Sequence, residues 1–419
     1  MRSVLAVAGA VLCAGLAVTP AAARQASPEE QAAAIARPAI VFIQSSWHGW
    51  VRDKRTSEVF GGAEGYQVTV SCSGAVINGD GYVATAGHCV DPGPNGGGGG
   101  LIDLAMADLA AAGRVRDPAL GRQQLVENAV LEGAKPGSKP TRQIQVERAT
   151  GEPGSRSRDV APATVVDLAA PTEGDVAVLK VPRSNLPAVV LAGDDVAVGT
   201  PVLAIGYPAS TDEATDPTLE PSSKNGQVSN HRSQAGHPFL EISAAVTHGM
   251  SGGPVVDMRG RVVGVISQLS PGETQSFNLA AAAKSVTGLL RGKGVEDALG
   301  PTDRNYRTGL EAYFTGDYDT AVEYLDAVLA ATPVHPQARR YRDLAARHGG
   351  TVSGDGTLIA LLATCAGVAL AAGAAGIVLA VRGRRQRLVA AMNAPTPPYG
   401  FPAPVTVVTE DAVTEEPRS

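Results

Sequence analysis

The chain has 419 residues, of which 44% are apolar and 18% are charged, and its formal net charge is -6. This composition excludes disorder throughout and is sufficient for two or three units with real cores. A net negative chain without a local basic patch also argues against nucleic-acid binding.

The N-terminus has the pattern of a secretory signal peptide. Arg2 is followed by an apolar run from Val4 to Val18 and then by Ala21, Ala22 and Ala23. A basic start, a short apolar stretch and small residues before the cut are typical of exported proteins, so we expect residues 1–23 to be removed. The alternative, an uncleaved anchor, needs a longer apolar run.

From Pro38 the sequence has many short β-strand patterns separated by Gly, Pro, Asn and Asp, which predicts a mainly β fold of the sandwich or barrel type. After five consecutive glycines, residues 101–112 have helical spacing, and we expect an inserted helix in a surface excursion that runs to about residue 162. The predicted strands are 39–44, 67–77, 82–86, 164–168, 176–181, 201–205, 239–243, 254–256 and 261–267.

Residues 304–347 change to a helical pattern. Gly309, Gly316, Ala321, Leu325 and Pro333 fall at spacings that resemble a single tetratricopeptide repeat, with helices at 305–315, 318–331 and 336–347. One repeat cannot bury its apolar face alone, so this segment is either a spacer that packs on a neighbour or a peptide-binding module.

A membrane span is predicted near the C-terminus. Residues 358–381 contain no charge and would form a helix of about 36 Å, against a hydrocarbon thickness of about 30 Å. Four arginines follow between 382 and 387, and positive flanks stay cytoplasmic. We therefore expect a single-pass protein of the cell membrane, with residues 24–357 outside the cytoplasm and a disordered tail, 382–419, inside.

Of the four cysteines, Cys13 leaves with the signal peptide and Cys365 lies in the predicted span, so Cys72 and Cys89 are the only thiols of the exported region. That compartment permits oxidation. If the two pair, they close a loop that is worth on the order of 3 kcal/mol in the chain-entropy model. Two thiols without clustered histidines do not indicate a metal site, and we expect no cofactor.

Three segments carry chemistry, in the chain order His88, Asp175 and Ser251. A serine hydroxyl becomes a good nucleophile when an imidazole can take its proton and a carboxylate orients that imidazole. Asp194 and Asp195 are less suitable acids because they stand in a turn pattern, and His248 is a less suitable base than His88. Ser251 lies in the run 249–254, Gly-Met-Ser-Gly-Gly-Pro, where glycines permit a sharp turn whose Gly249 and Ser251 N–H groups can bind an oxyanion.

These segments resemble the trypsin-like (chymotrypsin-fold) serine peptidases, and the blocks 78–83, 198–208, 226–229 and 243–254 are closest to the HtrA/Deg branch. The resemblance covers about residues 38–290 and implies two β-barrels with a catalytic triad between them, in a protease domain at 38–294. It implies His88 as base, Asp175 as its orienting acid, Ser251 as nucleophile and a Cys72–Cys89 disulfide. It also implies that a substrate peptide adds as a strand to Ser267, Gln268 and Leu269.

Departures from the family pattern bear on regulation and specificity. Met250 stands where trypsins have an acid that pairs with a newly cut N-terminus, so activation by that cleavage is not expected. Ala245 stands at the floor of the specificity pocket and is neutral, which favours small or medium apolar residues before the cut. No PDZ domain is expected after the protease domain, which leaves regulation and the oligomeric state, a homo-oligomer included, open.

We therefore predict a membrane-anchored serine endopeptidase that cleaves the polypeptide chains of exported proteins. The alternative is a catalytically silent, membrane-tethered adaptor that binds partners through the helical segment.

Overall fold

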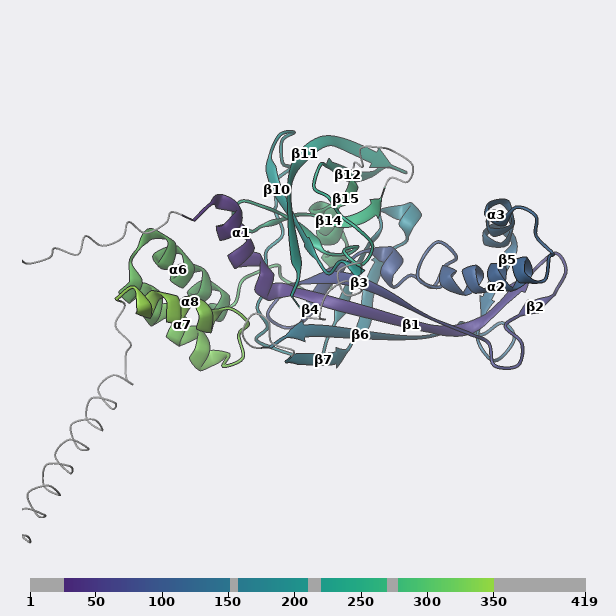
Figure 1. Ribbon diagram of the computed structural model, residues 1–419, viewed down its shortest axis with the longest axis horizontal. Helices are drawn as coiled ribbons and strands as arrows, with labels where there is room; N and C mark the ends of the chain where they lie inside the picture. The colour runs from purple at the N-terminus through teal and green to yellow at the C-terminus, as the bar shows by residue number, and fades with distance from the viewer. Residues whose placement is uncertain (1–25, 151–156, 210–219, 270–277, 350–419) are drawn as a thin grey trace, which may run out of the picture. The chain divides into compact units, whose positions relative to one another are not determined.

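The computed structural model describes residues 26–150, 157–209, 220–269 and 278–349. The internal contacts divide the chain after Ser353, and the second unit, Gly354–Ser419, lies outside the described residues. In the first unit the strands form two groups, a nine-stranded sheet and a closed barrel, and a group of helices follows them (Figure 1).

The sheet is antiparallel and has the strand order β7-β6-β1-β3-β4-β9-β8, with β2 and β5 paired to the far end of β1. Burial alternates along β1 because successive side chains point to opposite faces of a strand. Its strands are β1 (Ile40–Asp53), β2 (Val59–Phe60), β3 (Tyr66–Asn78), β4 (Tyr82–Thr85), β5 (Ala129–Glu132), β6 (Thr141–Ala149), β7 (Arg158–Pro162), β8 (Thr164–Ala169) and β9 (Val176–Lys180).

The two ends of this strand order are neighbours in the sequence, because only Ala163 separates β7 from β8. The Ala163 N–H donates to Ile144 O of β6 (3.0 Å). A sheet whose first and last strands are joined by one residue has to curl, so this half of the fold is barrel-like.

The second group is a closed barrel in the order β10-β11-β12-β15-β14-β13. One cluster of buried residues contains members of both groups, including Val76 and Val178 from the sheet and Ile205 and Val265 from the barrel. The predicted mainly β, two-barrel-like architecture is therefore observed. The barrel strands are β10 (Pro201–Gly206), β11 (Ser222–Gln234), β12 (His237–Ile242), β13 (Pro254–Asp257), β14 (Val262–Leu269) and β15 (Asn278–Ala282), and α5 (Ala283–Leu290) follows.

The segment that was expected to be a surface excursion is only partly one. Helices α2 (Gly99–Ala111) and α3 (Pro118–Asn128) pack on the far end of β1, where Trp47 and Val51 share a core with Leu101. The helix predicted at 101–112 is thus confirmed. The rest of the expectation was wrong, because β6 pairs with β1 along Phe42–His48 and belongs to the main sheet.

The predicted helical segment is present as α6 (Pro301–Thr315), α7 (Tyr318–Ala331) and α8 (Ala338–Arg347), close to the expected bounds. Helix α1 (Pro28–Ala36) was not expected from the sequence. Its Ala34 shares a core with Tyr306 and Leu310 of α6, and the Tyr306 hydroxyl donates to Ala34 O (2.9 Å). The helices are therefore packed against an N-terminal segment of the chain.

Two predictions fall outside the described residues: the signal peptide at 1–23, and the span at 358–381 with its tail. Among the described helices, none combines the length and the apolar character that crossing a membrane requires.

Candidate active site

His88 and Asp175, which are 87 positions apart, form a direct pair. His88 lies in a 3-10 turn, Gly87–Cys89, just after β4, and Asp175 immediately precedes β9, which pairs with β4. The His88 Nδ1 lies 2.9 Å and 3.1 Å from the two carboxylate oxygens of Asp175. The Asp175 side chain is fully buried, whereas that of His88 is 26% exposed, so the imidazole is partly accessible to solvent.

Further donors hold the Asp175 carboxylate. The backbone N–H of His88 donates to Oδ1 (2.7 Å), and the Ser267 hydroxyl of β14 donates to Oδ2. A buried carboxylate needs such donors because it has lost its water. Asp175 has the left-handed φ of 50°, which its short polar side chain tolerates better than most.

Ser251 lies in a sharp turn directly before β13. Gly249 and Gly252 both have positive φ, 89° and 82°. A side chain at Gly252 would overlap Thr85 Oγ1 and Ser73 O, so the turn lies directly on the sheet that carries His88. Backbone bonds fix it on both sides, since Ser73 N donates to Ser251 O (2.7 Å) and Gly252 N donates to Ile266 O (2.7 Å).

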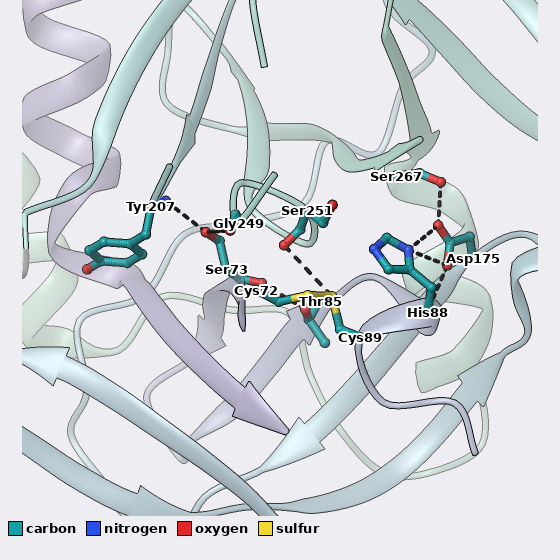
Figure 2. Close-up of a disulfide and its surroundings, with 10 residues drawn as sticks. All are labelled: Cys72, Ser73, Thr85, His88, Cys89, Asp175, Tyr207, Gly249, Ser251 and Ser267. Carbon is teal, nitrogen blue, oxygen red and sulfur yellow. Dashed lines mark hydrogen bonds and ion pairs between the residues drawn. A yellow bond between two sulfur atoms is a disulfide. The ribbon is translucent and has the colours of Figure 1, made fainter. Parts of the chain in front are cut away.

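Figure 2 shows Ser251 and the His88 ring on the same side of the disulfide, with Asp175 on the side of the ring that faces away from Ser251. In this arrangement no hydrogen bond joins the Ser251 hydroxyl to His88 among the described residues. Likewise, the N–H groups of Gly249 and Ser251 have no acceptor within the described part of the chain. Two adjacent free donors beside a serine are the arrangement that an oxyanion requires.

The predicted disulfide between Cys72 and Cys89 is present, with the two Cα atoms 6.2 Å apart. It joins β3 to the residue after His88. One ring nitrogen of His88 lies within 4.8 Å of both sulfur atoms, but sulfurs that are bonded to each other are not thiolate ligands for a metal.

The four residues that were expected to bind substrate lie in three different environments. Ala245 is exposed, in the loop that leads to the Ser251 turn. On one edge, strand β14 pairs with β15 as far as Leu269. On its other edge it pairs with β13 only along Val262–Val265. Among the described strands, the backbone of Gln268 and Leu269 therefore has no partner on that second edge. Ser267 is only 3% exposed, and its side chain serves Asp175 rather than a substrate.

The Ser267 contact with Asp175 was missed from the sequence. The run Gly264-Val265-Ile266-Ser267 was interpreted as a substrate-lining strand, and nothing in the spacing places that hydroxyl beside an acid 92 positions away. A lone serine at the end of an apolar strand was the only signal.

Comparison with known proteins agrees with this geometry. Residues 72–265 match the model of the trypsin-like peptidase domain, somewhat less than half of the chain. A probable periplasmic serine endoprotease, DegP-like, from Ectopseudomonas mendocina is 39% identical over 103 residues, which is 24% of this chain and 21% of that protein. The corresponding protein of Chlamydia pneumoniae is 31% identical over 126 residues, or 30% of this chain and 25% of its own.

Residues 72–265 are thus similar to the trypsin-like peptidase domain, and part of the chain is related in sequence to DegP-like serine endoproteases. The matched segment spans about a fifth of the length of those relatives. Among solved structures, the HtrA-type protease AlgW with decapeptide is 20% identical and covers 63% of this chain and 66% of its own, at a TM-score of 0.38. The active form of the Rv3671c protease from M. tuberculosis is also 20% identical. The match covers 64% of this chain and 86% of that protein, at a TM-score of 0.38.

Proposed function

We propose that this protein is a serine endopeptidase with His88, Asp175 and Ser251 as its catalytic residues. The observation that carries the proposal is the pair between the buried Asp175 carboxylate and His88 Nδ1, which leaves Nε2 as the free nitrogen beside the Ser251 turn. A carboxylate on Nδ1 fixes the tautomer that can accept a proton at Nε2. The peptidase-domain match and the DegP-like relatives support the same assignment, and they do not favour the adaptor alternative.

The chemistry follows the acyl-enzyme route. As Ser251 Oγ bonds to the substrate carbonyl carbon, His88 Nε2 takes the hydroxyl proton and Asp175 stabilises the imidazolium. The carbonyl oxygen becomes an oxyanion that accepts hydrogen bonds from the N–H groups of Gly249 and Ser251. The C–N bond then breaks, and the leaving amine takes the proton from His88. Water repeats the sequence in reverse, which releases the acid and restores Ser251.

A fluorophosphonate probe tests this proposal, since it reacts covalently with an activated serine. We expect the native protein to be labelled, and Ser251→Ala and His88→Ala to lose labelling. Ser243→Ala, which removes an exposed hydroxyl outside the triad, is the control and is expected to retain it. A folded native protein that does not label, and does not cleave a denatured polypeptide, would contradict the proposal.

The place of action is part of the same proposal. We place the peptidase domain outside the cytoplasm, with residues 358–381 as its membrane anchor and exported proteins as its substrates. The Cys72–Cys89 disulfide and the periplasmic assignment of the DegP-like relatives support an exported domain. Protease accessibility of a C-terminal tag in intact cells, compared with lysed cells, tests the topology: protection only in intact cells is expected.

Specificity is proposed from Ala245. A neutral side chain at this position cannot pair with Lys or Arg, so cleavage after small or medium apolar residues is expected. Mass spectrometry of a digested peptide library measures this directly, and cuts confined to Lys and Arg would contradict it. Ala245→Asp is the matched variant, and it should shift the preference toward basic residues.

A further inference from the structure

Ser73 is a fully buried polar residue on β3, between the disulfide residue Cys72 and the turn that carries Ser251. No role follows for it from the catalytic chemistry above. A buried hydroxyl in a strand is usually explained by its partners. Every polar group of Ser73 has one, and three of its four bonds reach residues next to the barrel strands β10 and β13.

Four hydrogen bonds to other segments meet at this residue, and Figure 2 shows the two that its hydroxyl makes. Its hydroxyl donates to Gly249 O (2.8 Å) and accepts from the N–H of Tyr207 (2.8 Å). Its N–H donates to Ser251 O (2.7 Å), and its carbonyl accepts from the Thr85 hydroxyl (2.7 Å). Ser73 thus contacts the Ser251 turn at two carbonyls, one on each side of Met250.

The other two carbonyls of the turn are also held. His248 O accepts from the N–H of Ala209 (2.9 Å), and Met250 O accepts from the N–H of Gly253 (3.0 Å). Because a peptide unit is planar and trans, fixing a carbonyl also fixes the N–H on the opposite side of the same unit. The unit of His248 O carries the Gly249 N–H, and the unit of Met250 O carries the Ser251 N–H. Ser73 holds the unit between these two, which joins Gly249 O to the Met250 N–H, and the unit that follows them.

Ser73 supplies two of the four, one from its hydroxyl and one from its N–H, and the Thr247 hydroxyl adds a longer bond to His248 O (3.3 Å). Gly249 has a left-handed φ of 89°, and as a glycine it can leave this conformation at little steric cost. Without the hydroxyl, the buried Gly249 carbonyl would lose its donor, and rotation of that unit would move the adjacent N–H groups.

We infer that Ser73 is a positioning residue that holds the Gly249 and Ser251 N–H groups in the oxyanion-binding orientation. The inference rests on the proposed peptidase function. Its chemical consequence is specific: the loss should be confined to states that carry a negative oxygen, namely the tetrahedral intermediate and its analogues.

The test compares Ser73→Ala, Ser73→Thr and the control Ser45→Ala in the full-length chain. Ser45 is also a buried serine of the same sheet, and its hydroxyl has no partner among the described residues. For Ser73→Ala we expect kcat on a peptide substrate to fall by about 10- to 100-fold, less than the loss of an oxyanion donor itself, with KM changed by less than about 3-fold. Ser73→Thr should recover most of the loss, and Ser45→Ala should match the native protein.

A second readout separates positioning from stability. A peptide trifluoromethyl ketone forms a tetrahedral adduct on the serine, and its affinity for Ser73→Ala should fall by the same factor as kcat. The affinity of a product-like peptide, measured in the Ser251→Ala background, should not change. A purely structural role would lower the melting temperature without this selective loss.

Native kcat and native ketone affinity in folded Ser73→Ala would overturn the inference. If Ser73→Ala does not fold, Ser73→Cys carries the test, because a thiol of similar shape is a weaker donor. Folded Ser73→Cys with native kcat would overturn it as well. A native protein that turns over no peptide would instead overturn the proposed function, and the inference with it.

Discussion

Asp175 has a left-handed backbone and a fully buried carboxylate, two features that each cost free energy in isolation. Both are compensated by the hydrogen bonds that converge on it from the backbone and ring of His88 and from Ser267. The carboxylate of Asp175 is therefore held in one orientation, and its contact with Nδ1 sets the orientation of the His88 ring.

Removal of the Ser267 hydroxyl tests this arrangement. Ser267→Ala removes one of the two groups that donate to Asp175 Oδ2 and leaves His88 Nδ1 as the other. A hydrogen bond to a charged group is worth about 1.5–3 kcal/mol. We expect kcat/KM to fall by about 10-fold or somewhat more, because part of the lost interaction affects the orientation of His88. Steady-state kinetics on a fluorogenic peptide measures it, and Ser267→Thr is the conservative control. Unchanged kinetics in Ser267→Ala would show that the two remaining donors suffice.

His335 is the buried histidine of the helical segment, and it should make stability depend on pH. Its Nδ1 accepts the N–H groups of Gln337 and Ala338 at the start of α8, and its ring lies 4.4 Å from that of Tyr306. Burial, with a smaller contribution from Arg148 of β6, lowers the pKa of His335 to about 3. Protonation of Nδ1 would also replace an acceptor with a donor that faces two N–H groups.

The sign follows from proton linkage. The unfolded chain binds a proton at His335 near its ordinary pKa of about 6.5, whereas the folded chain does not until about 3. The stabilising contribution is therefore complete above pH 6.5 and is lost as the pH falls from 6.5 toward 3. In His335→Asn, the amide oxygen can still accept a hydrogen bond from the Gln337 N–H, two residues ahead, but the side chain does not titrate. We therefore expect the stability of this variant to depend less on pH. Urea unfolding at pH 7.5 and at pH 5 measures this dependence. An equal change in unfolding free energy between the two pH values in the native protein and in His335→Asn would contradict the prediction.

At the level of elements, the disulfide joins the strand that contacts the Ser251 turn to the turn that carries His88. Replacement of Cys72 and Cys89 together by alanine opens a loop with a sequence separation of 17. The chain-entropy model gives a loss on the order of 3 kcal/mol for such a loop. Denaturant unfolding with and without dithiothreitol checks this: the reductant should destabilise the native protein and leave the double variant unchanged. If full reduction of the disulfide leaves the unfolding free energy of the native protein unchanged, the disulfide does not contribute to stability.

The elements that the sequence predicted well are those with a strong apolar pattern. Strand β9 is buried along almost its whole length, and its bounds were found within a residue. Strand β11, Ser222–Gln234, was missed because its thirteen residues are mostly polar, and it is held by pairing with β10 and β12 rather than by apolar alternation. The Ala-rich α1 was missed for a related reason, since small side chains give little periodicity although Ala32, Ala34 and Ala36 are buried.

The proposed catalytic residues have a local sequence signal, whereas the residues that hold them in place do not. His88, Asp175 and Ser251 are chemically distinctive and stand in short glycine-containing motifs that can be recognised locally. Ser73 and Ser267 are ordinary serines in apolar strands, and their contacts with Gly249 and Asp175 join positions 176 and 92 residues apart. These serines reach their partners only because the sheet packs against the barrel, and a single sequence contains no signal for that packing.

For the whole of the described unit, the main question is whether the helices α6–α8 unfold with the strands or separately. The loop after β9 contacts the helices directly. Asn185 Nδ2 donates to Ala331 O (3.1 Å) and Thr332 Oγ1 (2.8 Å), and its Oδ1 accepts from the Thr302 hydroxyl (2.9 Å). The N–H of Ala188 donates to Asp303 Oδ1 (2.9 Å), whose pKa is raised by burial. These bonds link the start of α6 and the end of α7 to the loop after β9.

Asn185 also has a left-handed φ of 54°, which dictates the choice of variant. Asn185→Gly removes the side-chain bonds without backbone strain and should cost about 1–2 kcal/mol of unfolding free energy. Asn185→Ala should cost about 1 kcal/mol more, because alanine disfavours that conformation. If helices and strands form one cooperative unit, the near-UV and far-UV circular dichroism transitions of each variant will coincide and shift together. A first transition that shifts alone, while peptidase activity persists through it, would show instead that the helices are a separate module on an independently stable protease domain.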